Sequence, residues 1–348
     1  MKPIASLCKD LKSGKPPLRK HLNRPVASWS ESDRYHDDII KAFVIILKTK
    51  GCSWAQESGC TMCGYFNDSA FSEVTNEQLL SQFHTAMASY HGEPVVKIFT
   101  SGSFFDSDEI PVPVRETILT ELSQKTEKTA VESRPEYITP ELLDGLSDCL
   151  STMKLEVGIG LETITDSLRD LSINKGFTYD DYRKAASLLK HNNHLIKTYV
   201  LVKPPFLTEQ QSITETLNTI TAINDITDTI SINPTNIQKR TLVEYLWKRH
   251  YYRPPWLWSI IEILSEASQI TSKRIQCDIV GGGSIRGAHN CKTCDKPVSR
   301  AIQQFSLSQD PNNLVTSDCA CKSQWKDQLM LEQISFGSLP DVQRGLIA

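Results

Sequence analysis

The sequence predicts an α/β fold, a partial (βα)6 TIM-like barrel with a small C-terminal metal-binding domain. Two observations predict the barrel: short apolar segments alternate six times with longer amphipathic ones, and the composition, 39% hydrophobic and 23% charged, is that of a globular protein. A third observation predicts the metal-binding domain, because four of the ten cysteines form two close pairs near the C-terminus.

Six short segments rich in Val, Ile, Phe or Thr predict buried strands, at 42–48, 95–100, 128–133, 154–160, 196–202 and 228–233. Amphipathic segments predict helices at 76–90, 114–124, 140–149, 165–171, 179–191 and 210–224. Helix starts are indicated by Thr75 or Asn76 before the first helix and by the capping threonines Thr139, Thr178 and Thr208. Strand–helix units in succession imply a parallel sheet, whose chemistry lies at the carboxyl ends of its strands.

The expected domain boundaries are a basic N-terminal arm at 1–40, the barrel at 41–235 and a C-terminal extension at 236–348. Up to residue 24 the arm has seven Lys and Arg against Asp10 alone, and its Cys8 is expected to be exposed. The arm is either a solvated segment or one that contacts nucleic acid.

No segment predicts a membrane association. The longest apolar run, residues 42–47, is far shorter than the roughly 20 residues that span a bilayer. The basic first 24 residues contain no apolar stretch of the kind found in secretory signals. We therefore expect a cytoplasmic protein with reduced thiols.

Three cysteines, Cys52, Cys60 and Cys63, follow the first predicted strand and lie in a loop at the catalytic face of the barrel. Three thiolates hold a [4Fe–4S] cluster while leaving its fourth iron open. Zinc would need a fourth ligand, such as His84 or His91. A third interpretation is that the cysteines are core or incidental residues.

The runs Gly51–Trp54 and Gly59–Tyr65 resemble the radical S-adenosylmethionine (radical SAM) superfamily, which has three cysteines after the first strand of a partial (βα)6 barrel. The C-x7-C-x2-C spacing departs from the usual C-x3-C-x2-C, and Met62 replaces an aromatic residue, but longer first spacings occur in the Elp3-like branch. The chain closely resembles the archaeosine-forming members of that branch, and this resemblance extends to residues 287–291 in the tail.

The resemblance implies S-adenosylmethionine (SAM) contacts at the ends of successive strands. Backbone groups of Ser101, Gly102 and Ser103 would contact SAM, and the side chains of Glu132 and Arg134 would make polar contacts with it. Gly160 would let SAM approach the backbone beside Glu162, and Tyr199 would orient SAM or the substrate. Tyr199, Lys203 and Glu162 are candidate catalytic residues. Each position also has a structural interpretation, as a tight turn, a salt bridge, a helix N-terminal charge or a rigid loop.

The second cysteine group, Cys291, Cys294, Cys319 and Cys321, offers four thiolates, the stoichiometry of a closed structural Zn²⁺ site. A second iron–sulfur cluster or no metal are the alternatives. His289 and Cys277 are reserve ligands, although Cys277, like Cys149, is expected to be a core residue.

Basic residues surround the tail site and alternate with aromatic residues upstream, at 239–258. This pattern is typical of RNA contacts. The alternative is that Lys and Arg side chains extend over aromatic residues of the core to reach solvent. The basic residues around the tail site are Lys273, Arg274, Arg286, Lys292, Lys296 and Arg300.

The resemblance implies a tRNA-modifying enzyme that cleaves SAM reductively to a 5′-deoxyadenosyl radical. The radical would abstract hydrogen from the lysine moiety of a lysine-adducted 7-cyano-7-deazaguanine at tRNA position 15, and carbon–nitrogen cleavage would give archaeosine. The implied partners are tRNA, the lysine-adding archaeosine synthase alpha subunit and an electron donor. The alternatives are another Elp3-like or methylthiotransferase-type enzyme, or a non-catalytic zinc-containing RNA-binding protein.

Overall fold

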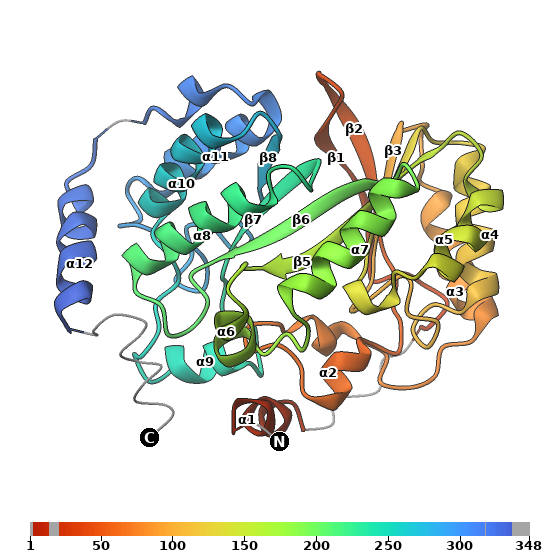
Figure 1. Cartoon of the computed structure of the whole chain (residues 1–348), viewed down its shortest axis with the longest axis horizontal. Helices are drawn as coiled ribbons and strands as arrows, with labels where there is room; N and C mark the ends of the chain where they lie inside the picture. Colours follow the sequence, from red (N-terminus) through yellow and green to blue (C-terminus); the bar gives the residue numbers. More distant parts are fainter. Residues whose placement is uncertain (1–2, 14–20, 317, 336–348) are drawn as a thin grey trace.

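The computed structural model describes residues 3–13, 21–316 and 318–335, and a curled eight-stranded sheet forms its centre (Figure 1). The strands lie side by side in chain order, β1 antiparallel to β2 and all later neighbours parallel. They are β1 (Ala27–Tyr35), β2 (Asp38–Ile46), β3 (Val95–Phe99), β4 (Lys128–Glu132), β5 (Lys154–Glu162), β6 (Leu195–Val202), β7 (Thr229–Pro234) and β8 (Arg274–Cys277). This half-barrel confirms the predicted α/β class and all six predicted strands.

The sheet is wider than predicted, because β1 and β8 lie outside residues 41–235. β1 has the polar sequence ASWSESDRY, and β8 has only four residues. Both are edge strands, which need less apolar sequence than a strand between two neighbours. The apolar runs that identify the inner strands are therefore missing from both.

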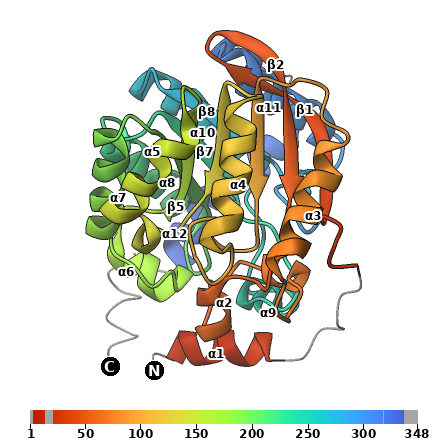
Figure 2. The same ribbon diagram turned by 90° about the vertical axis from the view of Figure 1, so that its right-hand side faces the viewer.

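Helices cover the outer face of the sheet (Figure 2). They are α3 (Asn76–Met87), α4 (Val112–Ser123), α5 (Pro140–Leu150), α7 (Tyr179–His191), α8 (Glu209–Ile223), α10 (Leu257–Ile270) and α11 (Asp295–Ser308). The predicted caps are confirmed, since Thr139 accepts a backbone N–H bond and Thr75, Thr178 and Thr208 form capping boxes. The short helix α6 (Asp166–Leu168) continues into a π-helical turn, Arg169–Ile173.

One end of the barrel carries α1 (Pro3–Lys12), α2 (Ser53–Glu57) and α9 (Leu242–Trp247), and the β1–β2 turn lies at the opposite end (Figure 1). The first end is the mouth, where the parallel strands finish. Cys8 was predicted to be exposed, but it is only 1% exposed because it packs on the inner side of α1. Lys15, Arg19 and Lys20 of the predicted arm lie outside the described residues.

The remaining helix, α12 (Cys321–Ser335), follows the second cysteine group. Among the helices that the structure describes, none is both long and apolar enough to cross a membrane.

The inner face of the sheet is polar. On β6, Ile196, Val200 and Val202 join the apolar core under the helices, so that Lys197 and Tyr199 face the lumen of the barrel. Charged or polar residues occupy many of the inward positions of β3 to β8, whereas β2 presents Ala42 and Val44 there. The lumen is therefore divided into an ionic floor near the amino ends of the parallel strands and a mouth at their carboxyl ends.

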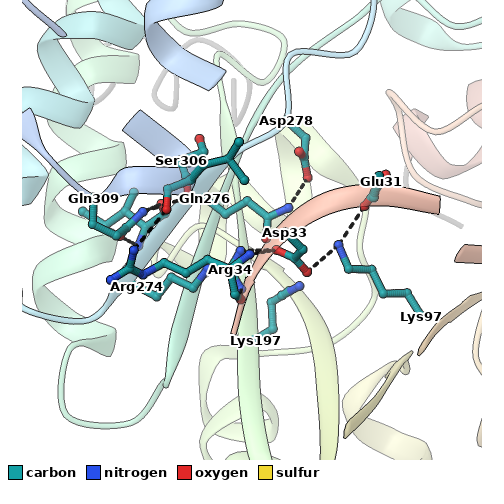
Figure 3. A network of polar contacts seen from close by, with 12 residues as sticks. Glu31, Asp33, Arg34, Lys97, Lys197, Arg274, Gln276, Asp278, Ser306 and Gln309 are labelled. Carbon is teal, nitrogen blue, oxygen red and sulfur yellow. Dashed lines mark hydrogen bonds and ion pairs between the residues drawn. The ribbon is translucent and has the colours of Figure 1, made fainter. Parts of the chain in front are cut away.

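At the floor, buried charges pair with one another (Figure 3). Lys97 Nζ lies 2.8 Å from both Asp33 Oδ2 and Glu31 Oε1. Glu156 lies between two ammonium groups, 2.9 Å from Lys128 and 3.0 Å from Lys197. Burial alone would raise the pKa of Glu156, but Lys197 and Lys128 lower it to about 2.

The same network joins the two edges of the sheet. Arg274 of β8 forms an ion pair with Asp33 of β1 and donates to the Arg34 carbonyl oxygen at 2.7 Å. The prediction placed Arg274 among the RNA contacts. In the structure its guanidinium instead binds β1, and we call this contact between β1 and β8 the seam. Arg286, predicted likewise, pairs with Glu244 at 2.8 Å and stacks over Trp247.

Candidate active site

The three-cysteine loop follows β2 at the mouth and is fixed by hydrogen bonds to the π-helical turn. Thr61 donates its N–H to Ile173 O at 2.9 Å and its hydroxyl to Ser172 O at 2.7 Å. Asn174 donates to Gly59 O at 2.8 Å. Cys60 and Cys63 pack with Trp54, Met62, Ile173 and Leu201 in a small apolar cluster. The loop geometry therefore depends on a segment more than a hundred residues later in the chain.

Helix α1 covers this loop. Lys12 Nζ donates to Cys60 O at 3.0 Å and to Ser58 O at 3.3 Å. Gly59 has a φ of +82°, and a Cβ there would collide with the Lys12 ammonium. Glycine is thus needed both for the left-handed backbone and for the approach of the lysine. The result is a positive charge held against the cysteine loop.

The three thiols are not close enough together to be ligands of one metal ion. Burial raises the pKa of Cys52 to about 12 and also raises the pKa of Cys63, so both thiolates need a cationic partner. In the described part of the chain, only the C-terminal cysteines bring three or more ligand atoms within 4.8 Å of one another. The Sγ atoms of the loop are therefore spread more widely than one zinc ion requires.

The turn after β3 lies against the first cysteine. A Cβ on Gly102 would come within 2.6 Å of Cys52 Cα, so only glycine lets this turn reach the loop. Glu109 holds the turn, accepting from Ser103 N at 2.6 Å and Thr49 Oγ1 at 2.5 Å. Burial raises the pKa of Glu109 to about 7. The predicted turn Ser101–Ser103 thus lies beside the three-cysteine loop, supported by the Glu109 carboxyl group, which sequence motifs did not identify.

A second polar group spans β4 to β6. Tyr199 hydrogen-bonds to Glu132, and a Cβ on the intervening Gly158 would be 2.8 Å from the Tyr199 ring. Burial raises the pKa of both groups, which keeps Tyr199 protonated. Tyr65 follows Cys63 at the mouth, is 53% exposed, and accepts a hydrogen bond from Ser101 Oγ at its backbone carbonyl oxygen, at 3.4 Å. Tyr65 and Asp278 were not predicted as site residues.

A third group links β5 to the π-helical turn. Lys175 Nζ lies 2.6 Å from Glu162 Oε1, and a Cβ on Gly160 would be 2.5 Å from the same ammonium. Burial alone would lower the pKa of Lys175, but Glu162 and Cys60 raise it. Arg134 donates to Lys175 O at 2.9 Å and stacks 5.2 Å from the Trp54 ring. Gly160 thus makes room for Lys175, a residue that no sequence pattern identified.

Lys203, predicted as a catalytic candidate, pairs with neither the Glu132–Tyr199 group nor the Glu162–Lys175 group. Its ammonium lies 2.6 Å from Glu209, and its carbonyl oxygen accepts from Tyr252 at 2.6 Å. Glu209 also accepts from Trp256 N and from Ser259, so that this pair connects β6 to α8 and α10. The geometry around Lys203 is that of a buried structural ion pair.

The C-terminal cysteines form a second, tighter site. Successive Sγ atoms are separated by 3.7 Å for Cys291–Cys294, 3.6 Å for Cys291–Cys319, 3.5 Å for Cys294–Cys321 and 3.6 Å for Cys319–Cys321. A tetrahedral zinc ion with Zn–S bonds of about 2.3 Å requires sulfur separations of about 3.8 Å. The four residues therefore fit one tetrahedral ion. 

Neighbouring donors already point at these sulfurs. Trp258 Nε1 donates to Cys321 Sγ at 3.3 Å, and Asn290 Nδ2 donates to Cys294 Sγ at 3.3 Å. A hydrogen bond from the Cys294 backbone N–H is the main cause that lowers the pKa of Cys291 to about 6. His289 is bonded to Gly287 O instead, and Cys277 lies in the core, so neither reserve ligand joins the set.

No family model matches the chain, but curated proteins do. It is 42% identical over 321 residues to archaeosine synthase subunit beta of Methanosarcina acetivorans, covering 91% of this chain and 93% of that one. It is 37% identical over 306 residues to archaeosine synthase subunit beta of Thermococcus kodakarensis, covering 86% and 94%. A solved Elp3 from Methanocaldococcus infernus is similar with a TM-score of 0.47 and 17% identity, over 66% of this chain and 59% of that one.

Proposed function

Because the chain belongs to the archaeosine synthase subunit beta family of radical SAM enzymes, we propose that it catalyses the radical step of archaeosine formation in tRNA. The observation that carries this proposal is the three-thiol loop at the barrel mouth, with the Gly102 turn packed against Cys52. A loop with three thiols has the donors for a [4Fe–4S] cluster with one open iron.

Cys52, Cys60 and Cys63 would hold the cluster, and SAM would bind beside it. When bound, these groups supply a 5′-deoxyadenosyl radical that abstracts hydrogen from the substrate. The chain's own part is to bind and orient. The turn Ser101–Ser103 offers backbone groups, and its position is held by Glu109.

The polar groups of the mouth support the placement of SAM and substrate. Glu132 of β4 and Tyr199 of β6 form one hydrogen-bonded pair, and Glu162 of β5, the strand between them, forms an ion pair with Lys175. Arg134, stacked over Trp54, connects the second pair to the cysteine loop. Side chains held in this way are preorganised, which reduces the reorganisation that binding requires.

The substrate of the proposed reaction is a 7-cyano-7-deazaguanine base at tRNA position 15 that carries lysine through its side-chain amine. Hydrogen abstraction from the lysine moiety, followed by carbon–nitrogen cleavage, would leave the formamidine of archaeosine. The lysine-adding alpha subunit would supply this substrate, and an external donor would supply the electron. 

The segment after β7 is the proposed tRNA-contacting surface. Tyr251 is 78% exposed, the Lys248 side chain is 58% exposed, and Arg249 stacks on Tyr245 at 3.6 Å. Exposed aromatic and cationic groups together favour phosphates and unstacked bases.

The C-terminal cysteines are proposed to hold a structural Zn²⁺. Their tetrahedral spacing supports this, and the ion would connect the loop before α11 to the start of α12. Metal analysis of Cys294→Ala should show loss of zinc with iron retained. Loss of iron instead would assign a second cluster there, as a methylthiotransferase-type enzyme requires.

The test of the whole proposal uses anaerobically reconstituted protein with reductant, SAM and lysine-adducted tRNA. We expect broad visible absorbance from the cluster, formation of 5′-deoxyadenosine and appearance of archaeosine in the tRNA. Protein that binds zinc at Cys52, Cys60 and Cys63 and forms no 5′-deoxyadenosine would be a non-catalytic RNA-binding protein, and the proposal would be rejected.

A further inference from the structure

The side of the lumen formed by β7 and β8 carries polar groups that neither the cysteine loop nor the floor uses. Ile230 and Ile232 of β7, and Ile275 and Cys277 of β8, pack outward into the core. The alternating residues therefore face the lumen, and Ser231 and Gln276 are directly paired in the strand register. Asp278 follows on the same side of β8, toward the mouth.

Two of these groups are buried without a hydrogen-bond partner. Ser231 is fully buried, and its hydroxyl oxygen has no partner among the described residues. The Gln276 amide donates to Asp278 Oδ2 at 2.8 Å, which leaves its own carbonyl oxygen buried and unpartnered (Figure 3). Buried polar atoms are costly unless bonded, so two of them on adjacent strands indicate a place for a ligand.

Asp278 differs from the acids of the floor in having no basic partner. Asp33, Glu31 and Glu156 each form an ion pair with a lysine, whereas none of the described Lys or Arg residues pairs with Asp278. The strand register places Tyr199, Ser231 and Gln276 in one row across β6, β7 and β8, and the exposed Asp278 lies two positions beyond Gln276, toward the mouth.

The acceptor groups of Ser231, Gln276 and Asp278 favour a cationic ligand. A carboxylate, an amide carbonyl oxygen and a hydroxyl oxygen are all able to accept, and an alkylammonium group has three N–H donors to offer them. A lysine attached to a base through its side-chain amine keeps its α-ammonium free. 

We propose that Asp278, Gln276 and Ser231 form a subsite for the α-ammonium group of the substrate's lysine moiety. The inference rests on the proposed function and adds to it the residues that distinguish lysine from other amines. With its ammonium held there, the methylene chain would lie against Tyr199, which is paired with Ser231 in the strand register.

Binding affinity tests the subsite directly. The two probes are tRNA carrying the lysine adduct and the same tRNA carrying an adduct of 6-aminohexanoic acid, which lacks only the α-ammonium. The wild-type protein should bind the lysine adduct about 10- to 100-fold more tightly, the range expected for hydrogen bonds to a charged group. Asp278→Asn should bind both probes within about 3-fold of each other.

A matched control is Asp37→Asn, which removes the same charge from the exposed β1–β2 turn at the opposite end of the barrel and should retain the preference. Ser231→Ala should reduce the preference partially.

The outcomes separate the two claims. Equal wild-type affinity for both probes, or a preference that survives in Asp278→Asn, would overturn the subsite whether or not archaeosine forms. Selective binding of the lysine adduct without conversion would support the subsite and overturn the assigned reaction.

Discussion

The floor and the mouth of the barrel are both polar, but they differ in how their charges are satisfied. At the floor, Glu156 has two lysine partners and Asp33 has a lysine and an arginine. At the mouth, Cys60 is a buried thiol, Cys52 and Cys63 are half-buried thiols, and Ser231 and Gln276 have oxygens without a partner among the described residues. Polar groups with internal partners, at the floor, stabilise the fold, whereas polar groups without them, at the mouth, are available to bind a ligand.

The largest expected effect is at the mouth. Cys60→Ala should abolish 5′-deoxyadenosine formation and iron binding, because two remaining thiolates cannot hold the cluster. Its apo form should unfold at nearly the wild-type denaturant concentration, since the floor is untouched. Iron content and 5′-deoxyadenosine are measured together with urea unfolding. Cys149→Ala, a buried cysteine on α5, is the control and should retain iron. An active Cys60→Ala protein would contradict the assignment of the loop.

At the floor, Glu156→Gln should destabilise the protein by about 3–5 kcal/mol, because it leaves Lys128 and Lys197 buried without this counter-charge. The pKa of Glu156 is lowered from 4.5 to about 2, so its contribution to stability is complete above about pH 4.5 and is lost as the pH falls toward 2. Urea unfolding of the apo proteins should show a smaller difference from wild type near pH 3 than near pH 7. A difference independent of pH would argue against the ion pairs.

A smaller loss is expected at the seam. Arg274→Met removes the link between β8 and Asp33 but leaves Asp33 paired with Lys97, so we expect a loss of about 2 kcal/mol. Filter binding should show unchanged affinity for tRNA, in contrast to the role first predicted for this residue. Arg300→Met, which changes an exposed residue of α11, is the control for stability. Weakened tRNA binding with unchanged stability would return Arg274 to the RNA surface.

The smallest effect lies outside both regions. Thr178 caps α7, accepting from Asp181 N at 3.2 Å and donating to the Asp181 carboxylate at 2.7 Å. Thr178→Ala should cost about 1 kcal/mol in thermal or urea unfolding while leaving iron content and tRNA affinity at wild-type values. A loss of iron in this variant would mean that stability and cluster binding are not separable in the way the comparison implies.

Local patterns predicted much of the scaffold. Apolar runs identified the inner strands, capping threonines identified helix starts, and the spacing Cys52, Cys60, Cys63 identified the loop at the mouth. These features depend on residues close together in the sequence. They are the ones that periodicity and capping can reveal.

What could not be predicted depends on pairs that only folding brings together. Lys175 reaches Glu162 through a π-helical turn, and Glu109 reaches Thr49 across 60 positions. Asp33 has no apolar neighbours that would indicate a strand, and its partner Arg274 is 241 positions away. Charged residues with distant partners look like surface residues in a sequence.

The seam between β1 and β8 also has a consequence for biosynthesis. A ribosome adds roughly 5–20 residues per second, so Arg274 is synthesised about tens of seconds after β1. During that interval the outer edge of β1 exposes backbone N–H and C=O groups that could pair with a strand of another nascent chain. Ser30, Glu31, Ser32 and Asp33 make this edge a poor template for aggregation. The polar composition that obscured β1 in the sequence thus protects the unfinished protein, and Asp33 later serves as the closing contact.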